Sequence, residues 1–229
     1  MAINTAFKPA STAVKQRLIA HVMGREKSGK TNFSLTAPDP IILFDFDYGL
    51  EGVVHKFATS KKIYTSEYRI HEISPGKFVA EWDRFRNEFK IALNDPEVRS
   101  VVWDTGTEVW ELLRMARFGK LTQVMPHNYG PVNAEMRGLI RDAYSSDKNF
   151  IIVNKMTEQY LNDKPTGKFV FQGFKDIPYS SQINIHTQRN EDNEFQATIV
   201  DCRQNAAVMG IVLEGPLVDF QVVLNMVFS

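Results

Sequence analysis

Residues 24–31 read Gly24-Arg25-Glu26-Lys27-Ser28-Gly29-Lys30-Thr31, a complete G-x-x-x-x-G-K-T phosphate-binding loop. A mostly apolar stretch at residues 17–23 precedes the loop, and a helix-compatible stretch at residues 31–37 follows it. Strand, glycine-rich loop and helix, in this order, are the setting in which such a loop cradles the phosphates of a nucleotide. An ordinary glycine-rich turn is the alternative, and it would need neither flanking element. The stretch therefore predicts that the chain binds a nucleoside triphosphate.

The residue types of the loop suit phosphate chemistry. Its two glycines let backbone N–H groups turn toward phosphate oxygens, and the helix that begins there adds its positive end. We expect Lys30 to reach the β- and γ-phosphates of ATP and the Thr31 hydroxyl to bind Mg²⁺. The candidate nucleotide-binding residues are Gly24, Arg25, Glu26, Lys27, Ser28, Gly29, Lys30, Thr31 and Asn32.

Composition limits the possible settings. Lys+Arg and Asp+Glu both number 27 in this chain of 229 residues, so any nucleic-acid contact must come from local basic loops and not from a global field. Cys202 is the single cysteine, which excludes an intramolecular disulfide and favours a reducing compartment. No apolar run approaches the roughly 18 residues of a membrane span, and the first 16 residues lack the apolar middle of a signal peptide. We therefore expect a soluble, cytoplasmic protein with no membrane partner.

Apolar strand patterns and amphipathic helix patterns alternate along the chain. This alternation predicts an α/β fold in which helices flank a mostly parallel, twisted sheet. A hairpin is expected to follow, from residues 181–189 and 195–203 joined by a turn at 190–193. In the helix expected at residues 77–94, four aromatic residues recur at helical spacing and predict one aromatic face. The other expected strands are 17–23, 41–47, 98–104, 150–154 and a weaker edge strand at 67–73; the other expected helices are 31–37, 108–118 and 133–144.

Two predicted strands end in acids that would support hydrolysis. Val101-Val102-Trp103-Asp104 has the form of a Walker B strand, so we expect Asp104 to hold Mg²⁺ directly or through water. Capping of the next helix is the alternative role of this aspartate. Asp47 ends the strand at 41–47, and its carboxylate is expected to orient or deprotonate the attacking water. Asp45 and Glu51 are the runners-up, and a turn aspartate before Gly49 is the alternative.

A third polar residue ends the strand predicted at residues 150–154. Asn154 stands at the carboxyl end of this strand, the edge of a parallel sheet at which ligands bind. We expect its side chain to sense the γ-phosphate. An asparagine that only begins a loop is the alternative.

The order of these parts resembles the core of RecA-like recombinases: phosphate loop, strand with an acid end, Walker B strand, helix, strand with a polar end, long loop and hairpin. Trp103-Asp104-Thr105-Gly106-Thr107-Glu108 and the stretch from Gly119-Lys120-Leu121-Thr122 to Val132-Asn133-Ala134-Glu135 look like the short, phage-encoded RecA-like P-loop ATPases. These AAA-domain proteins are linked to single-strand annealing and homologous recombination. The resemblance covers residues 15–210. Its phosphate loop is shared by very many proteins, whereas these two stretches and Asp201-Cys202-Arg203 are more specific.

The resemblance implies an ATP-hydrolysing protein that forms rings or filaments with itself and binds single-stranded DNA. It also implies a single-strand-binding protein as a partner and, for a phage protein, the cytoplasm of the host bacterium. Residues 16–229 would form the ATPase domain after an arm at residues 1–15. In that arm Phe7-Lys8-Pro9-Ala10 matches the F-x-x-A tether of some recombinases, and a disordered arm is the alternative. Where recombinases usually have glutamate, Asp47 is one methylene shorter, so the attacking water would lie closer to the backbone.

Two loops face DNA in the family that the chain resembles. They correspond here to residues 117–129 and 158–175, where cations and aromatic residues are interleaved. Cations meet phosphates and rings stack on bases, so this mixture suits a single strand. A solvated connector is the alternative for each loop. The candidate DNA-binding residues are Arg117, Lys120, Tyr160, Lys164, Lys168, Phe171 and Lys175.

The hairpin implies a site shared between subunits. In the resembled family a basic residue at this position reaches the γ-phosphate bound by the neighbouring subunit. Arg203 matches that place and Arg189, on the partner strand, is the runner-up. A guanidinium there would neutralise charge that develops during phosphoryl transfer. An exposed arginine at a strand end is the alternative.

Two other classes of function remain open at this point. A small-molecule or nucleotide kinase also uses a phosphate loop in a compact α/β domain, but such kinases carry an arginine-rich lid, and the arginines of this chain are scattered. An ATP-dependent switch that loads a helicase or helps packaging is the other alternative.

Overall fold

The computed structural model describes residues 15–229 apart from residues 58, 75 and 121–123. The F-x-x-A match at residues 7–10 therefore lies outside the described residues. Strands and helices alternate through the first two thirds of the chain, as the sequence predicts. In chain order the elements are β1 (Ile19–Gly24), α1 (Lys30–Leu35), β2 (Ile41–Asp45), β3 (Ile63–Glu67), α2 (Phe78–Asn94), β4 (Ser100–Asp104), α3 (Gly106–Phe118), α4 (Tyr129–Ser145), β5 (Asn149–Leu161), β6 (Lys164–Phe171), α5 (Ile177–Ser180), β7 (Ile183–Arg189), β8 (Phe195–Cys202), β9 (Val212–Glu214) and α6 (Phe220–Phe228).

The described strands form one nine-stranded sheet in the order β3-β2-β4-β5-β1-β7-β8-β9, and β6 pairs with β5 outside this path. The neighbouring strands β3, β2, β4, β5, β1 and β7 are all parallel. Strands β8 and β9 extend this sheet in antiparallel pairs. The mostly parallel α/β fold with a C-terminal hairpin is thus confirmed. Because the registers pair Asp45 with Asp104 and Gly24 with Lys155, the carboxyl ends of the central strands meet at one edge.

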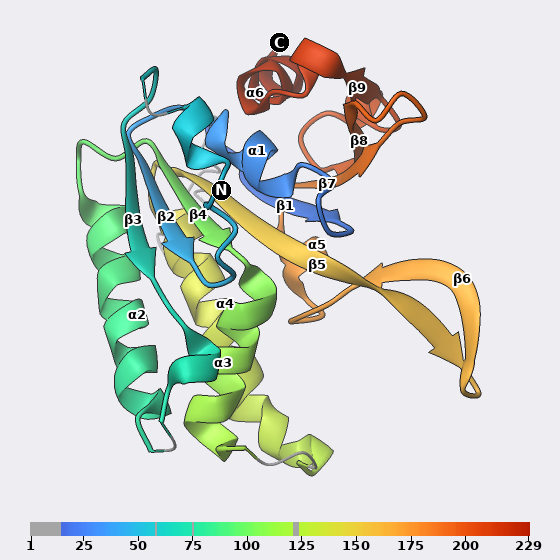
Figure 1. The fold of residues 1–229 in the computed structure, drawn as a ribbon. Coiled ribbons are helices and arrows are strands. Elements are labelled where there is room, and N and C mark those ends of the chain that lie inside the picture. Colours follow the sequence, from blue (N-terminus) through green and yellow to red (C-terminus); the bar gives the residue numbers. More distant parts are fainter. Residues whose placement is uncertain (1–14, 58, 75, 121–123) are drawn as a thin grey trace, which may run out of the picture.

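Helices cover both faces of the sheet (Figure 1). On one face α2, α3 and α4 enclose a largely aromatic core, and on the other α1 and α6 enclose an aliphatic one. The predicted aromatic face of α2 is confirmed: Phe85 meets Phe44 of β2 edge to face at 5.4 Å between ring centroids, and Phe89 lies 5.0 Å from Trp103 of β4. The strand that ends in Asp104 thus contributes side chains to both cores and lies between the two helical layers. None of the helices in the described part of the chain is long and apolar enough to span a bilayer.

The structure corrects several predicted boundaries. Strand β2 ends at Asp45 and not at residue 47, so Asp47 lies in the turn that follows the strand. The edge strand occupies Ile63–Glu67 and not residues 67–73, because Tyr68 and Ile70 turn into the aromatic core after the strand has ended. Their alternation therefore reflects two buried side chains beyond the strand, the second of which begins a short 3-10 helix (Ile70–Glu72). Helix α4 begins at Tyr129, four residues before the predicted start. Pro131 in its first turn is tolerated because an N–H at that position would have no partner within the helix.

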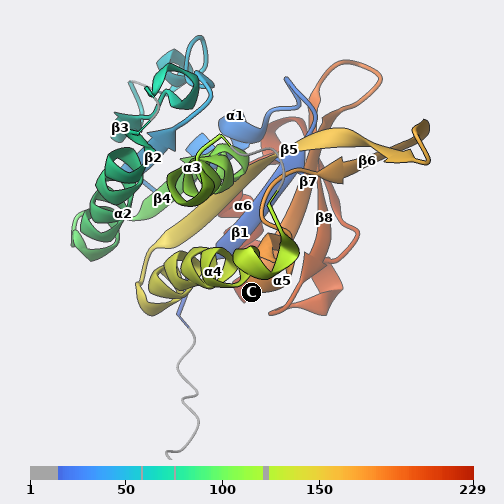
Figure 2. The ribbon, with the colours of Figure 1, turned by 90° about the horizontal axis from the view of Figure 1, so that it is seen from below.

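The long loop expected at residues 158–175 is instead mostly a β-ribbon. Strand β5 continues beyond the parallel sheet to Leu161 and pairs with β6 in antiparallel register. Asn162 and Asp163 connect the two strands with positive φ angles of 52° and 59°, the backbone conformation of a tight hairpin turn. Figures 1 and 2 show this ribbon projecting from the body of the molecule.

Candidate nucleotide-binding site

Close packing around the phosphate loop requires both of its glycines. A Cβ atom on Gly24 would lie 2.5 Å from the backbone oxygen of Thr187, and one on Gly29 would lie 2.6 Å from the ring of Phe195. Gly29 also has a φ of 91°, in the left-handed region that favours glycine. The loop thus brings bare backbone to the start of α1, the geometry that a phosphate cradle needs.

The lysine of the loop faces the space above it. Lys30 Nζ donates a hydrogen bond to the Arg25 carbonyl at 2.7 Å. Burial lowers the pKa of Lys30, the carboxylates of Asp104 and Asp47 act to raise it, and the neighbouring Lys155 adds to the lowering. Lys30 therefore shares one electrostatic environment with both predicted acids and with a second cation.

The predicted Mg²⁺ ligands lie together. Thr31 Oγ1 donates to Asp104 Oδ2 at 2.6 Å, and Gly49 passes closely beside this pair. Burial raises the pKa of Asp104 to about 6, although the hydrogen bond from Thr31 opposes the rise. Thr105, and not Asp104, caps α3 by accepting from the Glu108 N–H at 3.3 Å. A hydroxyl and a carboxylate oxygen fit Mg²⁺, which takes few protein ligands and completes its shell with water and phosphates.

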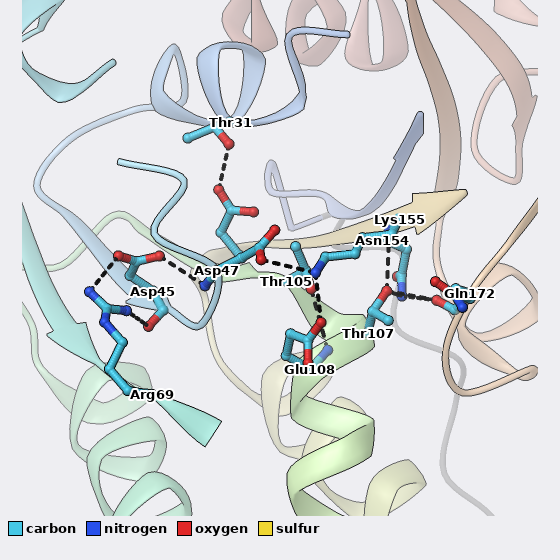
Figure 3. A network of polar contacts seen from close by, with 11 residues as sticks. Thr31, Asp45, Asp47, Arg69, Thr105, Thr107, Glu108, Asn154, Lys155 and Gln172 are labelled. Carbon is cyan, nitrogen blue, oxygen red and sulfur yellow. Dashed lines mark hydrogen bonds and ion pairs between the residues drawn. The ribbon is translucent and has the colours of Figure 1, made fainter. Parts of the chain in front are cut away.

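The three candidate acids, Asp45 at the end of β2 and Asp47 and Glu51 after it, differ in their surroundings. Asp45 is buried, pairs with Arg69 at 3.3 Å and accepts from the Asp47 N–H at 3.2 Å, so it supports the turn. Asp47 and Glu51 line the cleft above the phosphate loop. Asp47 also accepts from Lys155 Nζ at 2.9 Å (Figure 3). Of the three, Asp47 has the surroundings that a water-orienting carboxylate needs.

Asn154 is displaced from its expected role. Its amide nitrogen donates to Thr107 Oγ1 at 3.1 Å and to the Gln172 carbonyl at 2.7 Å, so it joins the start of α3 to the end of β6 (Figure 3). It does not line the cleft, whereas the next residue, Lys155, does. Among the described residues, Asn154 Oδ1 has no hydrogen-bond partner. The expectation that Asn154 itself touches the γ-phosphate is therefore not supported by its position.

The two candidate arginines lie at opposite ends of the hairpin. Arg203 follows β8, whose end pairs with the start of β7, and its guanidinium donates to the Tyr179 carbonyl at 2.8 Å. That edge is opposite to the phosphate loop, so Arg203 does not reach the site of its own subunit. Arg189 ends β7 beside the loop, lines the cleft and donates to the Lys27 carbonyl at 3.0 Å. Its guanidinium stacks over Phe195 at 4.3 Å.

The cleft has a volume of about 790 Å³, which suits a nucleotide. Among the predicted loop residues, Gly24, Arg25 and Ser28 do not line it; Ser28 is buried against Thr187, and Arg25 stacks on Phe169 of the ribbon at 4.4 Å. Sequence reasoning missed Lys155, although its place at the end of an apolar run was the same signal that selected Asn154. The predicted residues that line the cleft are Glu26, Lys27, Gly29, Lys30, Thr31, Asn32, Asp47 and Asp104, together with the runners-up Glu51 and Arg189. The lining residues not predicted are Tyr48, Gly49, Val53, Lys56, Thr105, Lys155, Met156, Thr157, Gln172 and Phe195.

The candidate DNA-binding residues fall into two groups. Tyr160, Lys164 and Lys168 are exposed on the ribbon. Phe171 is at the base of the ribbon and packs against the His21 ring at 5.3 Å between centroids, so it is not free to stack on a base. Lys175 follows the ribbon.

The other group, Arg117 and Lys120, lies at the end of α3, and only one of the two has its charge paired within the protein. Arg117 makes two hydrogen bonds to Glu135, at 2.9 and 2.7 Å, which neutralise its charge locally. Lys120 is exposed after that helix. The rest of this loop includes residues 121–123, which lie outside the described part of the chain.

A phosphate loop whose threonine is bonded to a buried strand-end aspartate defines the class of P-loop nucleoside triphosphatases. The family model described as an AAA domain matches residues 16–180, more than half of the chain. The chain belongs to this family and is a nucleotide-binding P-loop ATPase. Among curated proteins, none matches the sequence significantly. The matched range ends before β7, yet β7 pairs directly with β1, so the same sheet continues beyond it.

Proposed function

We propose that this protein is a Mg²⁺-dependent ATPase that assembles with itself and binds single-stranded DNA, in homologous recombination or strand annealing of the phage-encoded type. The observation that carries the ATPase part is the Thr31–Asp104 pair, 2.6 Å apart beside the phosphate loop. The DNA and assembly parts are supported by the projecting ribbon and by the family that the sequence resembles.

The residues of the cleft divide the chemistry of hydrolysis. Lys30 neutralises the β- and γ-phosphates, while Thr31 and Asp104 hold the metal ion. Bound Mg²⁺ supplies positive charge to the phosphate oxygens. Asp47 orients a water whose oxygen attacks the γ-phosphorus; the bond to the β–γ bridging oxygen breaks, and ADP and inorganic phosphate leave. The water proton passes to the Asp47 carboxylate or to the departing phosphate.

The ribbon is the element best suited to a single strand. Tyr160 is 62 % exposed and offers a stacking surface, and Lys164 and Lys168 can meet phosphates. Glu158 and Asp163 lie on the same ribbon and offset the two lysines. We therefore expect stacking to contribute much of the affinity and the salt dependence to be shallow.

The site is completed by a neighbouring subunit in this proposal. Arg203 is exposed at the edge of the sheet away from its own phosphate loop, so any phosphate it contacts belongs to another copy. Arg189 is the alternative, and it would act within its own cleft. Mixed assemblies distinguish the two residues, because a neighbouring subunit can supply an arginine that acts across the interface but not one that acts within its own cleft.

The size of the protein in solution tests the proposal. Light scattering would be measured with a slowly hydrolysed ATP analogue, Mg²⁺ and a single-stranded oligonucleotide, each added alone and together. We expect a large assembly with all three and none for Lys30→Ala, which deletes the cation facing the phosphates. A protein that stays small and ignores DNA while hydrolysing or transferring phosphate would instead favour a small-molecule kinase. Assembly on nucleotide without any DNA effect would favour the helicase-loading switch.

A further inference from the structure

Lys155 lies where β5 leaves the parallel sheet. Its Cα is in register with Gly24, the first residue of the phosphate loop, and the next residue, Met156, already pairs with Phe171 of the ribbon. The backbone is fixed on both sides, because the Lys155 N–H donates to Thr107 Oγ1 at 3.1 Å and its carbonyl accepts from the Gln172 N–H at 2.7 Å. The residue thus connects the phosphate loop, the start of α3 and the base of the ribbon.

The side chain of Lys155 points into the cleft and holds two acids there (Figure 3). Its Nζ lies 2.9 Å from Asp47 Oδ1 and 2.7 Å from Glu108 Oε1. Burial alone would lower the pKa of Lys155, but the hydrogen bonds to Glu108 and Asp47 outweigh it and the pKa is raised. The ammonium is therefore charged at neutral pH, and its field reaches Lys30.

The two ion pairs differ in a way that suggests which one exchanges. The Glu108 side chain is 12 % exposed and sits in the first turn of α3, whereas that of Asp47 is 45 % exposed on a turn. An ion pair that is exposed to solvent contributes little to stability, so the bond to Asp47 is the weaker anchor. An ammonium has three donors, so it can keep Glu108 while it accepts a new anionic partner.

We propose that Lys155 contacts the terminal phosphate of ATP within its own subunit, exchanging Asp47 for a phosphate oxygen while Glu108 keeps it in place. This inference rests on the proposed ATPase function and adds a residue that positions and reports the γ-phosphate. Two consequences follow. Asp47 is released from Lys155 and free to hydrogen-bond a water when a triphosphate is bound, whereas it stays paired with Lys155 when ADP is bound. Because the Lys155 backbone is bonded to Gln172, the exchange also reaches the ribbon.

The test compares nucleotides that differ in the terminal phosphate. Dissociation constants for ADP and for a non-hydrolysable ATP analogue would be measured by calorimetry with Mg²⁺ for the parent, Lys155→Met and Lys155→Arg. A hydrogen bond between charged partners justifies an expected loss of about tenfold or more for the analogue in Lys155→Met, with ADP changed by less than about threefold. Lys155→Arg should recover much of the loss because it keeps the charge. Lys90→Met, the same change on the exposed side of α2, should bind both nucleotides as the parent does.

The outcomes separate this inference from the proposed function. If the parent binds neither nucleotide, the nucleotide site itself is wrong and this inference falls with it. If the parent prefers the triphosphate and Lys155→Met keeps the same preference, or loses both nucleotides equally, Lys155 is not the terminal-phosphate contact although the site stands. Hydrogen exchange gives an independent readout. The backbone N–H of Gln172 should exchange more slowly with the analogue bound than with ADP bound in the parent, and this difference in exchange rate should vanish in Lys155→Met.

Discussion

Acid should weaken the fold through one histidine at the centre of the sheet. His21 of β1 is fully buried, its Nδ1 lies 2.8 Å from Asn184 Oδ1, and its Nε2 has no partner among the described residues. The carboxylate of Asp201 on β8 acts on His21 and accepts hydrogen bonds from the Asn184 amide at 2.8 and 2.9 Å, and the ring of Phe171 packs edge to face against the imidazole. Burial lowers the pKa of His21 from 6.5 to about 4, and the contacts with Asn184 and Asp201 only moderate this.

The sign follows from proton counting. Between pH 6.5 and 4 the unfolded chain protonates His21 and the folded one does not, so the free energy of unfolding falls as the pH falls through this window. From pH 7 to pH 5 the two pKa values correspond to a loss of about 2 kcal/mol. Asp104 acts in the opposite direction, because its folded pKa is raised from 3.8 to about 6 and the folded state gains protons first. Its contribution over the same range is a gain of about 1 kcal/mol.

Urea unfolding at pH 7 and pH 5, without nucleotide or Mg²⁺, would measure both effects. His21→Gln lowers stability at both pH values through lost packing, so the informative quantity is the difference between them. The free energy of unfolding should fall by about 2 kcal/mol less from pH 7 to pH 5 in His21→Gln than in the parent. His71→Gln, at an exposed position, is the matched control and should keep the parental pH dependence. A His21→Gln variant whose pH dependence equals that of the parent would refute the assignment of the acid sensitivity to this buried ring.

The other predictions concern the site. Lys30→Ala should abolish nucleotide binding or turnover, and Asp104→Asn should reduce Mg²⁺-dependent turnover more than nucleotide binding. A steady-state ATPase assay measures turnover and calorimetry measures binding. Parental turnover in Lys30→Ala would contradict the phosphate-loop assignment. Replacing Lys164 and Lys168 together by Ala should flatten the salt dependence of single-stranded DNA binding by at most about two phosphate contacts. An unchanged slope would show that these two lysines do not contact DNA phosphates. Arg203→Ala should bind nucleotide normally but lose about 10³-fold in turnover, and mixing it with Lys30→Ala protein should restore part of the activity. Two co-assembled mutants that stay inactive would exclude Arg203 as the shared residue.

The parts of the site that were predictable are those fixed by local sequence. The phosphate loop needs its glycines because Thr187 and Phe195 approach its backbone closely. All of the motif lies within eight consecutive residues, so it is visible in the sequence. Asp104 followed from its place at the end of an apolar strand, because carboxyl ends of parallel strands share an edge. Asn154 and Lys155 show the limit of this rule. Successive strand residues point to opposite faces, so an error of one position decides which side chain enters the cleft.

The ribbon and the C-terminal elements were missed for different reasons. Residues 156–161 carry polar side chains on both faces of the strand, so the sequence shows no alternation of apolar and polar residues that would predict it. The strand forms there through backbone pairing with β6. Helix α6 did have a signal: Asp219 caps it by accepting from the N–H groups of Gln221 and Val222, just before an apolar run. Its role in closing the aliphatic core follows from tertiary contacts with α1, such as Phe33 against Phe220.

The continuity of β5 has a thermodynamic consequence. One strand passes from the buried sheet through Lys155 in the cleft to the ribbon, and Arg25 of the phosphate loop stacks on Phe169 of β6 at 4.4 Å. The nucleotide site and the ribbon therefore share backbone and side-chain contacts. When both sites bind ligands, the coupling between them is reciprocal. If ATP changes the affinity of the ribbon for its ligand by some factor, that ligand changes the affinity for ATP by the same factor. Removing the Phe169 ring should reduce both changes together, whereas a fall in one alone would show that the two sites are not linked through this contact.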